Sequence, residues 1–355
     1  MAKNCQKDRP HWQFDESKKG MRWKVNWYLY NGENSDIVKS TKIKFSRNLS
    51  EFKFNLKSKE EIEKLENKVK ENLYNIGYGL KFLKLQDMDE ITKMSLVEKG
   101  LMNSNFAIKR YGSILINDEE NICIMIGGEN HLEIQVFNAG LDLENTLNLA
   151  IELDEKIGET LGYAVSKKYG YLTSTLNNIG TGLKASVIVH LPALAKTRNT
   201  RKVFDAIGDF GISIKEVYKG KSDIYQISNK HTLGISEKEI VKNLKVIVQT
   251  VIEQERQARK LIAKDEIGLS DLIYRSFGIL SNCRKISNEE TRELLSNIKL
   301  GVDLGILDEL TDVKVQKLYL YSKPANLQKY LGQKHDKEEL EIKRAEVIKQ
   351  IIKEN

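Results

Sequence analysis

Proline and cysteine are scarce in this chain of 355 residues, which contains three of each. The cysteines Cys5, Cys123 and Cys283 lie far apart with no paired spacing, so we expect neither disulfides nor a structural zinc site. No run of roughly 18 or more residues is apolar, so we expect no membrane-spanning helix. The first ten residues carry charges and no apolar segment, which predicts no secretory signal and a cytoplasmic protein.

The sequence also lacks any block of like charge. Lysine and arginine total 57 and aspartate and glutamate total 50, which gives a net charge of +7 with the two signs interleaved. Nucleic-acid-binding arms are typically built from runs of basic residues, so a nucleic-acid binder is the weakest hypothesis, and it predicts salt-sensitive association. A modest positive charge can attract phosphates or acidic partners, but an ordinary solvated surface explains it better.

Hydrophobic residues make up 40% of the chain, enough for a sizeable core, and their spacing predicts a first region of mixed structure. Strands are predicted at residues 37–45, 112–116, 122–126, 131–137, 212–218 and 224–228. Helices are predicted at residues 59–75, 141–161 and 196–207, and from Ser236, which forms a capping-box pattern with Glu239. The short polar connections within 112–137 favour an antiparallel meander.

Strand signals nearly disappear after residue 262. Helices are predicted at 269–281, 288–300 and 336–353, and we place a boundary near Ala263. We therefore expect an α+β fold, an antiparallel β-sheet flanked by helices, followed by a small all-α domain. The expected divisions are a flexible tail at 1–20, a sheet-containing domain at 21–262 and a helical domain at 263–355.

One segment carries more chemical information than any other. Leu172-Thr-Ser-Thr-Leu-Asn-Asn-Ile-Gly-Thr-Gly-Leu-Lys184 is a polar loop with two glycines, followed by an apolar run that we expect to be a buried element holding the loop in place. Backbone amides near glycines and the charge of Lys184 would suit a phosphate. The loop is neither a Walker loop nor a dinucleotide fingerprint, and by pattern alone a simple connecting loop explains it better.

The same segment resembles the active-site loop of the bacterial protein-arginine kinases, which are ATP:guanido phosphotransferases. In that family the loop runs Leu-Thr-Ser-Cys-Pro-Thr-Asn-Leu-Gly-Thr-Gly-Leu-Arg-Ala-Ser. Further segments resemble family motifs in the same order: residues 34–49, 127–135, 225–234, 301–305 and 324–331. The resemblance covers nearly all of the chain after residue 22. It implies a phosphotransferase domain at 21–262, a dimerising helical domain at 263–355, and transfer of the γ-phosphoryl group of Mg-ATP to arginine side chains of proteins.

The resemblance also implies a set of site residues, and most of them are altered here. Thr175 replaces the family's cysteine, while Glu129 keeps one of two expected carboxylates; the other aligns near Gly220. His190 corresponds to a residue near the adenine side of the nucleotide, and no metal site made by protein side chains is expected. Family arginines that bind nucleotide are replaced at Lys42, Lys44, Glu133, Lys184 and Lys215. Arg47 and Asn48 are retained, and we expect them to be structural.

These replacements predict a weakened enzyme. Lysine keeps the charge of arginine but loses its paired hydrogen bonds, and threonine cannot form a thiolate. Glu133 would place a negative charge beside the triphosphate. Loss of one oxyanion-type donor typically costs about 2.7–4 kcal/mol of transition-state stabilisation. The first hypothesis is therefore a catalytically weak or inactive binding or regulatory subunit, forming a homodimer or a heterodimer with an active homologue.

The second hypothesis is an active protein-arginine kinase with an unusual site. Four lysines would still supply a positive field for ATP, Glu129 could serve as the base, and Asp223 could replace the missing carboxylate.

A phosphoarginine pocket in the helical domain of the family carries the motif Arg-Asp-x-x-Arg-Ala. Here the matching segment is Leu340-Glu-Ile-Lys-Arg-Ala345, which keeps Arg344 and changes the acid to Glu341. One of the two arginines is missing, which argues against phosphoarginine sensing. A charged, solvated helix at 338–353 is the simpler interpretation.

Overall fold

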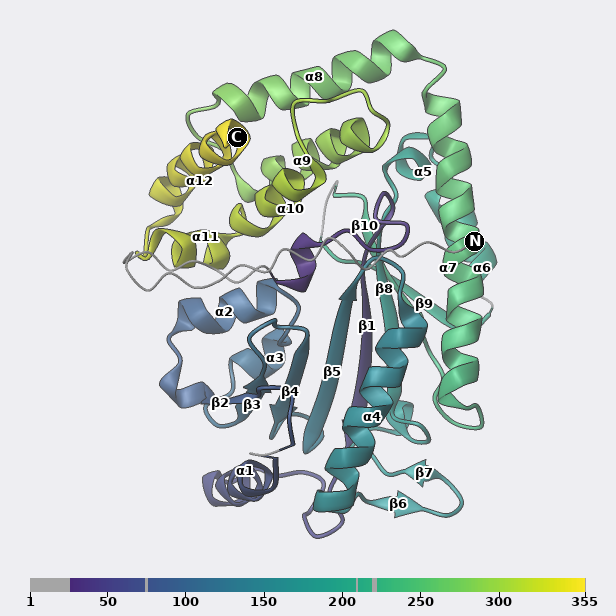
Figure 1. Ribbon diagram of the computed structural model, residues 1–355, viewed down its shortest axis with the longest axis vertical. Helices are drawn as coiled ribbons and strands as arrows, with labels where there is room; N and C mark the ends of the chain where they lie inside the picture. Colours follow the sequence, from purple (N-terminus) through teal and green to yellow (C-terminus); the bar gives the residue numbers. More distant parts are fainter. Residues whose placement is uncertain (1–25, 74–75, 209, 219–221, 355) are drawn as a thin grey trace, which may run out of the picture.

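The structure is a computed structural model that describes residues 26–73, 76–208, 210–218 and 222–354 (Figure 1). The predicted tail at 1–20 and the position near Gly220 lie outside the described residues. The strands are β1 (Val38–Arg47), β2 (Lys81–Lys84), β3 (Ser113–Ile116), β4 (Ile122–Ile126), β5 (Leu132–Ala139), β6 (Val165–Ser166), β7 (Gly170–Tyr171), β8 (Leu183–His190), β9 (Ile212–Glu216) and β10 (Ile224–Asn229). The α-helices are α1 (Lys59–Leu73), α2 (Glu90–Glu98), α3 (Ser104–Ala107), α4 (Leu143–Leu161), α5 (Pro192–Lys196), α6 (Thr200–Gly208), α7 (Glu237–Ile262), α8 (Glu266–Asn282), α9 (Asn288–Asp303), α10 (Asp312–Tyr321), α11 (Pro324–Leu331) and α12 (Lys337–Lys353).

In the described part of the chain, eight strands form one sheet in the order β2-β3-β4-β5-β1-β8-β10-β9. Each neighbouring pair is antiparallel, so the predicted meander at 112–137 is confirmed as β3, β4 and β5. Since β1 lies between β5 and β8, the first long strand of the sequence occupies the centre of the sheet. The predicted antiparallel α+β fold is confirmed.

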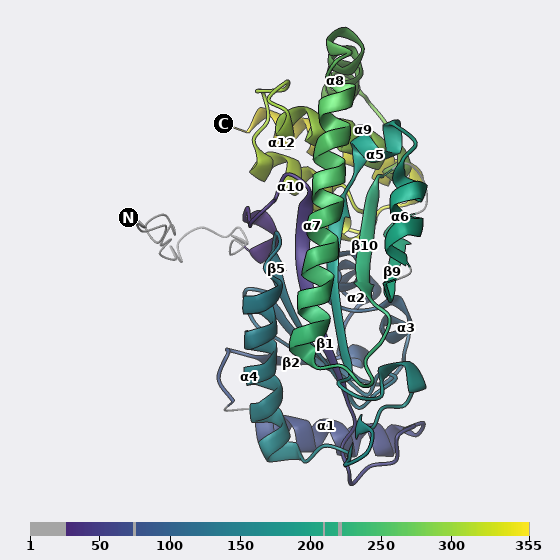
Figure 2. The same cartoon turned by 90° about the vertical axis from the view of Figure 1, so that its right-hand side faces the viewer.

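The two faces of the sheet are covered differently. Alternate strand residues such as Leu115 and Ile124 join the largest core cluster with side chains of α1, α4 and α7. Their neighbours, such as Ile114 and Cys123, point the other way and pack with α2, α3 and Trp27. Figure 2 shows α4 and α3 on opposite sides of the strands. Long helices therefore pack on one face of the sheet. Short elements pack on the other face, mainly over β3, β4 and β5.

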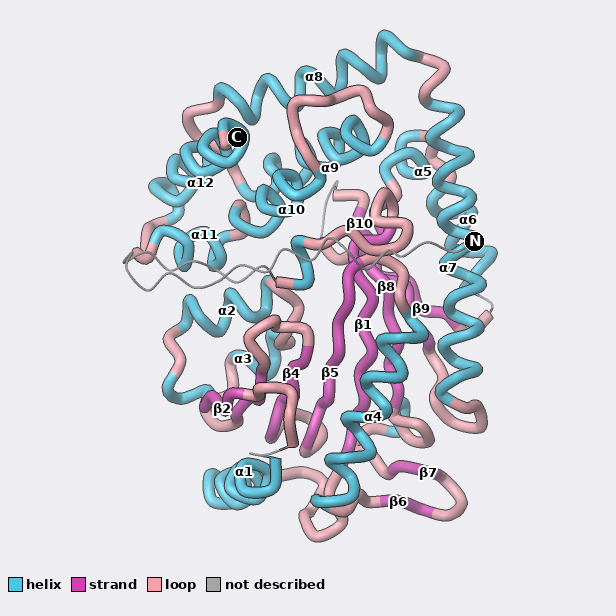
Figure 3. The backbone as a smooth tube through the Cα atoms, in the orientation of Figure 1, coloured by secondary structure: helices cyan, strands magenta, loops and turns pink. Residues whose placement is uncertain are grey.

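Helices alone follow Ile262 in the described residues, as the sequence predicted (Figure 3). They form a second core cluster, which also takes in Ile224 of β10 and packs against Ile188 of β8. These two side chains lie on the same sheet face as α2 and α3, at the end of the strands nearest to the helices. Lysines of β1, β8 and β9 lie on the rest of this face. No helix among the described residues is long and apolar enough to cross a membrane.

One predicted helix is wrong in detail. The segment predicted as a single helix at 196–207 is divided between α5 and α6. The side chain of Thr197 bonds back to the carbonyls of Ala193 and Leu194, and Arg198 takes a positive φ of 58°. Left-handed backbone cannot continue a right-handed helix, so the chain must restart at Thr200.

Candidate functional site

The strand register brings four lysines to one face of the sheet. Lys42 and Lys44 are two residues apart on β1, so both point to the same side, and Lys44 pairs directly with Lys184 of β8. Lys215 of β9 pairs with Gln226 of β10, and Gln226 pairs with Ile188 of β8, four residues after Lys184. Lys215 therefore points to the same side of the sheet as the other three lysines. We call the surface formed by Lys42, Lys44, Lys184 and Lys215 the lysine face. The segment between α2 and α3 reaches this face at Gly100, which Lys42 contacts.

Three of these lysines already contact the protein itself. Lys42 Nζ donates to the carbonyl of Gly100 at 3.3 Å, and Lys44 Nζ lies 3.2 Å from a carboxylate oxygen of Glu133. Lys184 Nζ donates to the carbonyl of Asn229. The ammonium groups are therefore directed towards protein oxygens within the lysine face.

Close packing lowers the proton affinity of two of the lysines. Burial, with added repulsion from Lys44, lowers the pKa of Lys42 to about 8 despite attraction from Glu133. Burial, with repulsion from Lys215 and Lys44, lowers the pKa of Lys184 to about 8. This repulsion reflects how close Lys44 lies to Lys42 and to Lys184, and how close Lys184 lies to Lys215. The positive charge of Lys42 and of Lys184 is therefore sensitive to pH in the weakly alkaline range.

A fifth lysine, Lys109, lies beside this region and was not predicted from the sequence. Lys109 Nζ donates to the carbonyls of Gly127 and Gly128, at 2.9 and 2.8 Å, immediately before Glu129. Burial lowers the pKa of Lys109, and attraction from Glu133 and Glu129 opposes that shift. Lys109 therefore holds the turn that carries Glu129. Nothing in the sequence indicated this role, because the partners of Lys109 are backbone carbonyls 18 and 19 residues later in the chain.

Glu129 and Thr175 belong to loops that touch. The backbone amide of Ser174 donates to Asn130 Oδ1 at 2.8 Å, which ties the turn after β4 to the loop before β8. Thr175 Oγ1 accepts a hydrogen bond from Asn178 Nδ2 at 3.0 Å. Glu129 itself is exposed. The structure therefore places the two predicted catalytic positions near each other, with a hydroxyl in place of a thiol.

In the second half of the 172–182 loop, the backbone amides are used within the protein. The amides of Asn178, Ile179, Gly180 and Thr181 all donate to protein carbonyls. Gly180 has a φ of 108°, and a Cβ there would lie 2.2 Å from the carbonyl oxygen of Thr232. The glycine is therefore required by the approach of a second loop. The predicted buried element that follows is confirmed as β8.

Arg47 and Asn48 support the site from behind. Arg47 is buried and donates to both carboxylate oxygens of Asp154 on α4, while its Nη1 donates to the carbonyl of Thr181. Asn48 Oδ1 accepts from the amide of His131 at 2.9 Å. These contacts join the sheet, α4 and the 172–182 loop, so the expected structural role of Arg47 and Asn48 fits the geometry.

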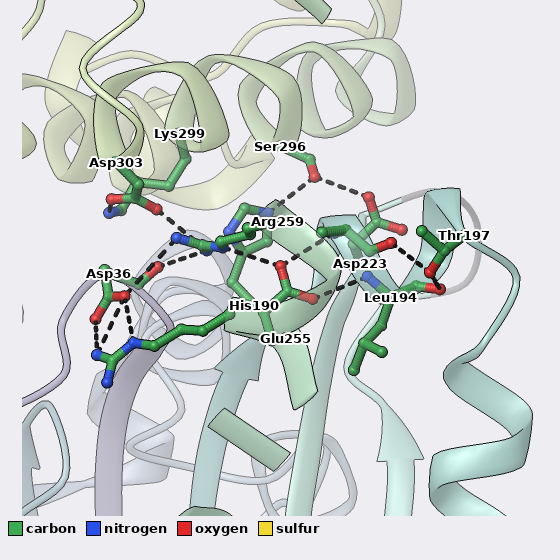
Figure 4. A network of polar contacts seen from close by, with 12 residues as sticks. Asp36, His190, Leu194, Thr197, Asp223, Glu255, Arg259, Ser296, Lys299 and Asp303 are labelled. Carbon is green, nitrogen blue, oxygen red and sulfur yellow. Dashed lines mark hydrogen bonds and ion pairs between the residues drawn. The ribbon is translucent and has the colours of Figure 1, made fainter. Parts of the chain in front are cut away.

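His190 lies away from the lysine face. It is 1% exposed, and its Nε2 lies 2.9 Å from Ser296 Oγ of α9 (Figure 4). Ser296 in turn donates to Asp223 Oδ2, so His190 must donate through Nε2. Burial and nearby cations hold the pKa of His190 well below its usual range. α9 covers His190, and the correspondence of this histidine to a residue near the adenine side of the nucleotide stays a prediction. Asp223 is engaged in the same interface.

The predicted phosphoarginine positions are also occupied by the protein. Arg344 is 2% exposed and donates to the carbonyls of Ser322 and Ile286 at 2.7 and 2.9 Å. Glu341 lies 3.8 Å from Lys285. The interpretation of 338–353 as a solvated helix is wrong, since α12 buries six side chains in the helical core: Leu340, Arg344, Ala345, Val347, Ile348 and Ile351.

Comparison with known proteins places these features in a family. A family model described as "ATP:guanido phosphotransferase, C-terminal catalytic domain" matches residues 61–258. A second, described as "Protein-arginine kinase McsB C-terminal domain", matches residues 266–355. Together they span the sheet, apart from β1, and the helical region.

Curated relatives and solved structures agree with this match. The chain is 42% identical over 332 residues to a protein-arginine kinase of Halothermothrix orenii, covering 91% of this chain and 95% of that protein. It is 39% identical over 338 residues to one of Bacillus pumilus, covering 92% and 93%.

Among solved structures, the duplicated taurocyamine kinase of Schistosoma mansoni has a TM-score of 0.56 at 23% identity, over 69% of this chain and 36% of that one. A lombricine kinase has a TM-score of 0.56 at 21% identity, over 66% and 69%. These two likenesses concern the fold alone. The chain belongs to the ATP:guanido phosphotransferase family, within its protein-arginine kinases.

Proposed function

We propose that this chain is a catalytically weak or inactive protein-arginine kinase relative that acts as a binding or regulatory subunit. One observation carries the proposal: the lysines at the positions where the resemblance implies nucleotide binding contact protein oxygens. Lys42, Lys44 and Lys184 contact a carbonyl, a carboxylate and a second carbonyl, respectively. A phosphate would have to compete with each of these contacts.

The difference between lysine and arginine explains why such contacts matter. A guanidinium has five N–H donors in a rigid plane, so it can bind a protein oxygen and still direct a pair of donors at a phosphate. An ammonium has three donors on a flexible stem and gives no paired, planar contact. Charge spreads over several oxygens of the transferring phosphoryl group, which needs fixed donors on more than one side. The lysine face supplies charge without that geometry.

Mg-nucleotide remains the cofactor class that the lysine face fits best. Lys42, Lys44, Lys184 and Lys215 would hold the phosphates, and magnesium would add positive charge when bound. The lysines would attract the phosphates from a distance but would orient the bound phosphates only weakly. We therefore expect nucleotide binding to be weak and transfer to be slow or absent.

An active kinase is the second candidate, and a specific observation favours it. Four lysines converge on one surface, and Glu129 lies on a loop that touches the loop of Thr175. The curated relatives named above are protein-arginine kinases. In this alternative, Glu129 takes the proton from an incoming guanidinium, and Lys184 stabilises the transferring phosphoryl group.

An arginine-phosphorylation assay separates the two candidates. The purified full chain is incubated with Mg-ATP and an arginine-rich protein, and phosphoarginine is measured by mass spectrometry, with Glu129→Gln and Lys184→Ala as matched variants. We expect no phosphoarginine above the level of the variants. Phosphoarginine that depends on both Glu129 and Lys184 would refute the proposal. A thermal-shift titration with Mg-ADP, run in parallel, reports binding without transfer.

The partners of such a subunit would be proteins. We propose a cytoplasmic homodimer, or a heterodimer with an active homologue, formed through the helical region after residue 262. Size-exclusion chromatography with light scattering tests the first form. A mass of 40.7 kDa for the chain alone would contradict the homodimer, and the same mass for this chain in a mixture with an active relative would contradict the heterodimer.

A further inference from the structure

We propose that Glu133 sets the anion affinity of the lysine face, because its carboxylate occupies the place of a phosphate group and must be displaced from Lys44 before a phosphate can bind. This inference rests on the proposed function, since it explains why nucleotide would bind weakly. It goes further by assigning the weakness mainly to one residue. It also predicts a gain of binding, which loss of the arginines alone would not.

The position of Glu133 fixes its carboxylate within the cationic region. Its backbone pairs with Ser46 of β1 and with Met125 of β4, so strands hold it on both sides. The residue is 3% exposed, and its carboxylate lies 3.2 Å from Lys44 Nζ. Only rotation of the side chain could move the charge away.

Neighbouring cations interact with the same carboxylate. Attraction from Glu133 raises the pKa of both Lys42 and Lys109 against the stronger effect of burial. Glu133 therefore lies among three ammonium groups, contributed by β1 and by the segment after α3. An external phosphate at this position would meet the same three cations, and it would also meet the negative charge of Glu133.

A glutamine would keep the shape of the side chain and remove that charge. Its amide oxygen can still accept a hydrogen bond from Lys44, so the local packing is preserved. Lys44, which pairs directly with Lys184 across β1 and β8, would then lack the counter-ion that Glu133 supplies. Removing one carboxylate from a partly buried cationic cluster strengthens its attraction for anions.

The chain offers a matched control in Glu66. It is also 3% exposed, and its carboxylate lies 3.7 Å from Lys84 Nζ. Glu66 lies on α1 and Lys84 on β2, so this pair is outside the lysine face. Glu66→Gln therefore removes a buried, lysine-paired carboxylate without changing the proposed phosphate position.

Calorimetric titration of the full chain tests the proposal, with Mg-ADP and inorganic pyrophosphate as the two probes. We expect Glu133→Gln to bind both probes at least about tenfold more tightly than the unmodified chain, and Glu66→Gln to bind them equally well. Adding Lys44→Met to Glu133→Gln should abolish the gain. Unchanged or weaker binding of pyrophosphate by Glu133→Gln would overturn the inference.

Two further measurements keep the outcome clear. Urea unfolding of each variant identifies a folding defect, and if Glu133→Gln is destabilised, Glu133→Leu serves as the second variant with the same expected gain. The arginine-phosphorylation assay on the unmodified chain is read separately. Transfer by that chain would refute the proposed function, whereas absence of a gain in affinity would refute only the role of Glu133.

Discussion

At the level of single residues, the lysine face differs from the family's pattern in charge and in hydrogen-bonding groups. The lysine face keeps a cation at four of the five positions where the resemblance implies an arginine. The fifth position is Glu133, whose carboxylate lies beside Lys44, and Thr175 has a hydroxyl where the family has a thiol. The substitutions were visible in the sequence. Their consequences were not, because the oxygen atoms that Lys42 and Lys184 contact belong to the backbone of Gly100 and Asn229.

Anion binding should weaken as the pH rises from about 7 to about 9. Burial lowers the pKa of Lys42 and Lys184 to about 8, so both are cationic below that pH and neutral above it. The phosphates of ADP are already ionised at neutral pH, so they do not contribute to the trend. We expect a fall in Mg-ADP affinity of about tenfold, measured by calorimetry. The double variant Lys42→Met, Lys184→Met should show a flat profile, and an equally steep profile in that variant would contradict this assignment.

Elements with a clear periodic pattern were predicted well. The central strands, α1, α4 and the Ser236–Glu239 capping box all depend on local sequence, and each is present. In contrast, α2, α10 and α11 were not predicted. α11 begins at Pro324, and its first amides are capped by Glu98, which lies 227 residues earlier in the chain. No local pattern can reveal a cap supplied from that distance.

The contact between α2 and α11 can be tested at Glu98. Its two carboxylate oxygens accept from the amides of Ala325 and Asn326, both at 2.8 Å. Glu98→Ala should cost about 1–2 kcal/mol of unfolding free energy and increase hydrogen exchange in α11, because two helix amides lose their acceptor. Glu90→Ala on the same helix removes only an exposed pair with Lys334 and should change stability by less than about 0.5 kcal/mol. Equal effects of the two changes would exclude Glu98 as a specific cap.

At the scale of the whole molecule, the helical region packs on the end of the sheet through polar as well as apolar contacts. Arg259 of α7 lies 3.4 Å from Asp303 of α9, and His190 reaches Ser296 (Figure 4). The sequence predicted both regions but not this junction, since each partner comes from a different part of the chain. The predicted division at Ala263 and the predicted dimer remain predictions.

This junction should make stability depend on His190 below neutral pH. Burial and nearby cations depress the pKa of His190 in the folded state, so the unfolded chain binds a proton more readily below the ordinary pKa of about 6.5. Stability contributed by neutral His190 is therefore lost as the pH falls from about 7.5 to about 5.5. Burial raises the pKa of Asp303 to about 6, which acts in the opposite direction. For this reason the effect of His190 is measured as the difference in unfolding free energy between the unmodified chain and a variant without this histidine.

Urea unfolding of the unmodified chain and of His190→Gln at both pH values supplies that difference. We expect the unmodified chain to lose about 1–2 kcal/mol more than the variant on acidification, because glutamine does not titrate but can still donate to Ser296. Equal losses in the two proteins would show that His190 does not carry the effect.

The most direct measurement is the initial rate of phosphoarginine formation from Mg-ATP by this chain, beside the protein-arginine kinase of Halothermothrix orenii on the same protein substrate. Loss of paired guanidinium contacts and of the thiol predicts a rate lower by at least about 10³-fold, or no detectable product. A rate within about tenfold of that relative, abolished by Glu129→Gln, would contradict the central claim that ammonium groups held by protein oxygens cannot support efficient phosphoryl transfer.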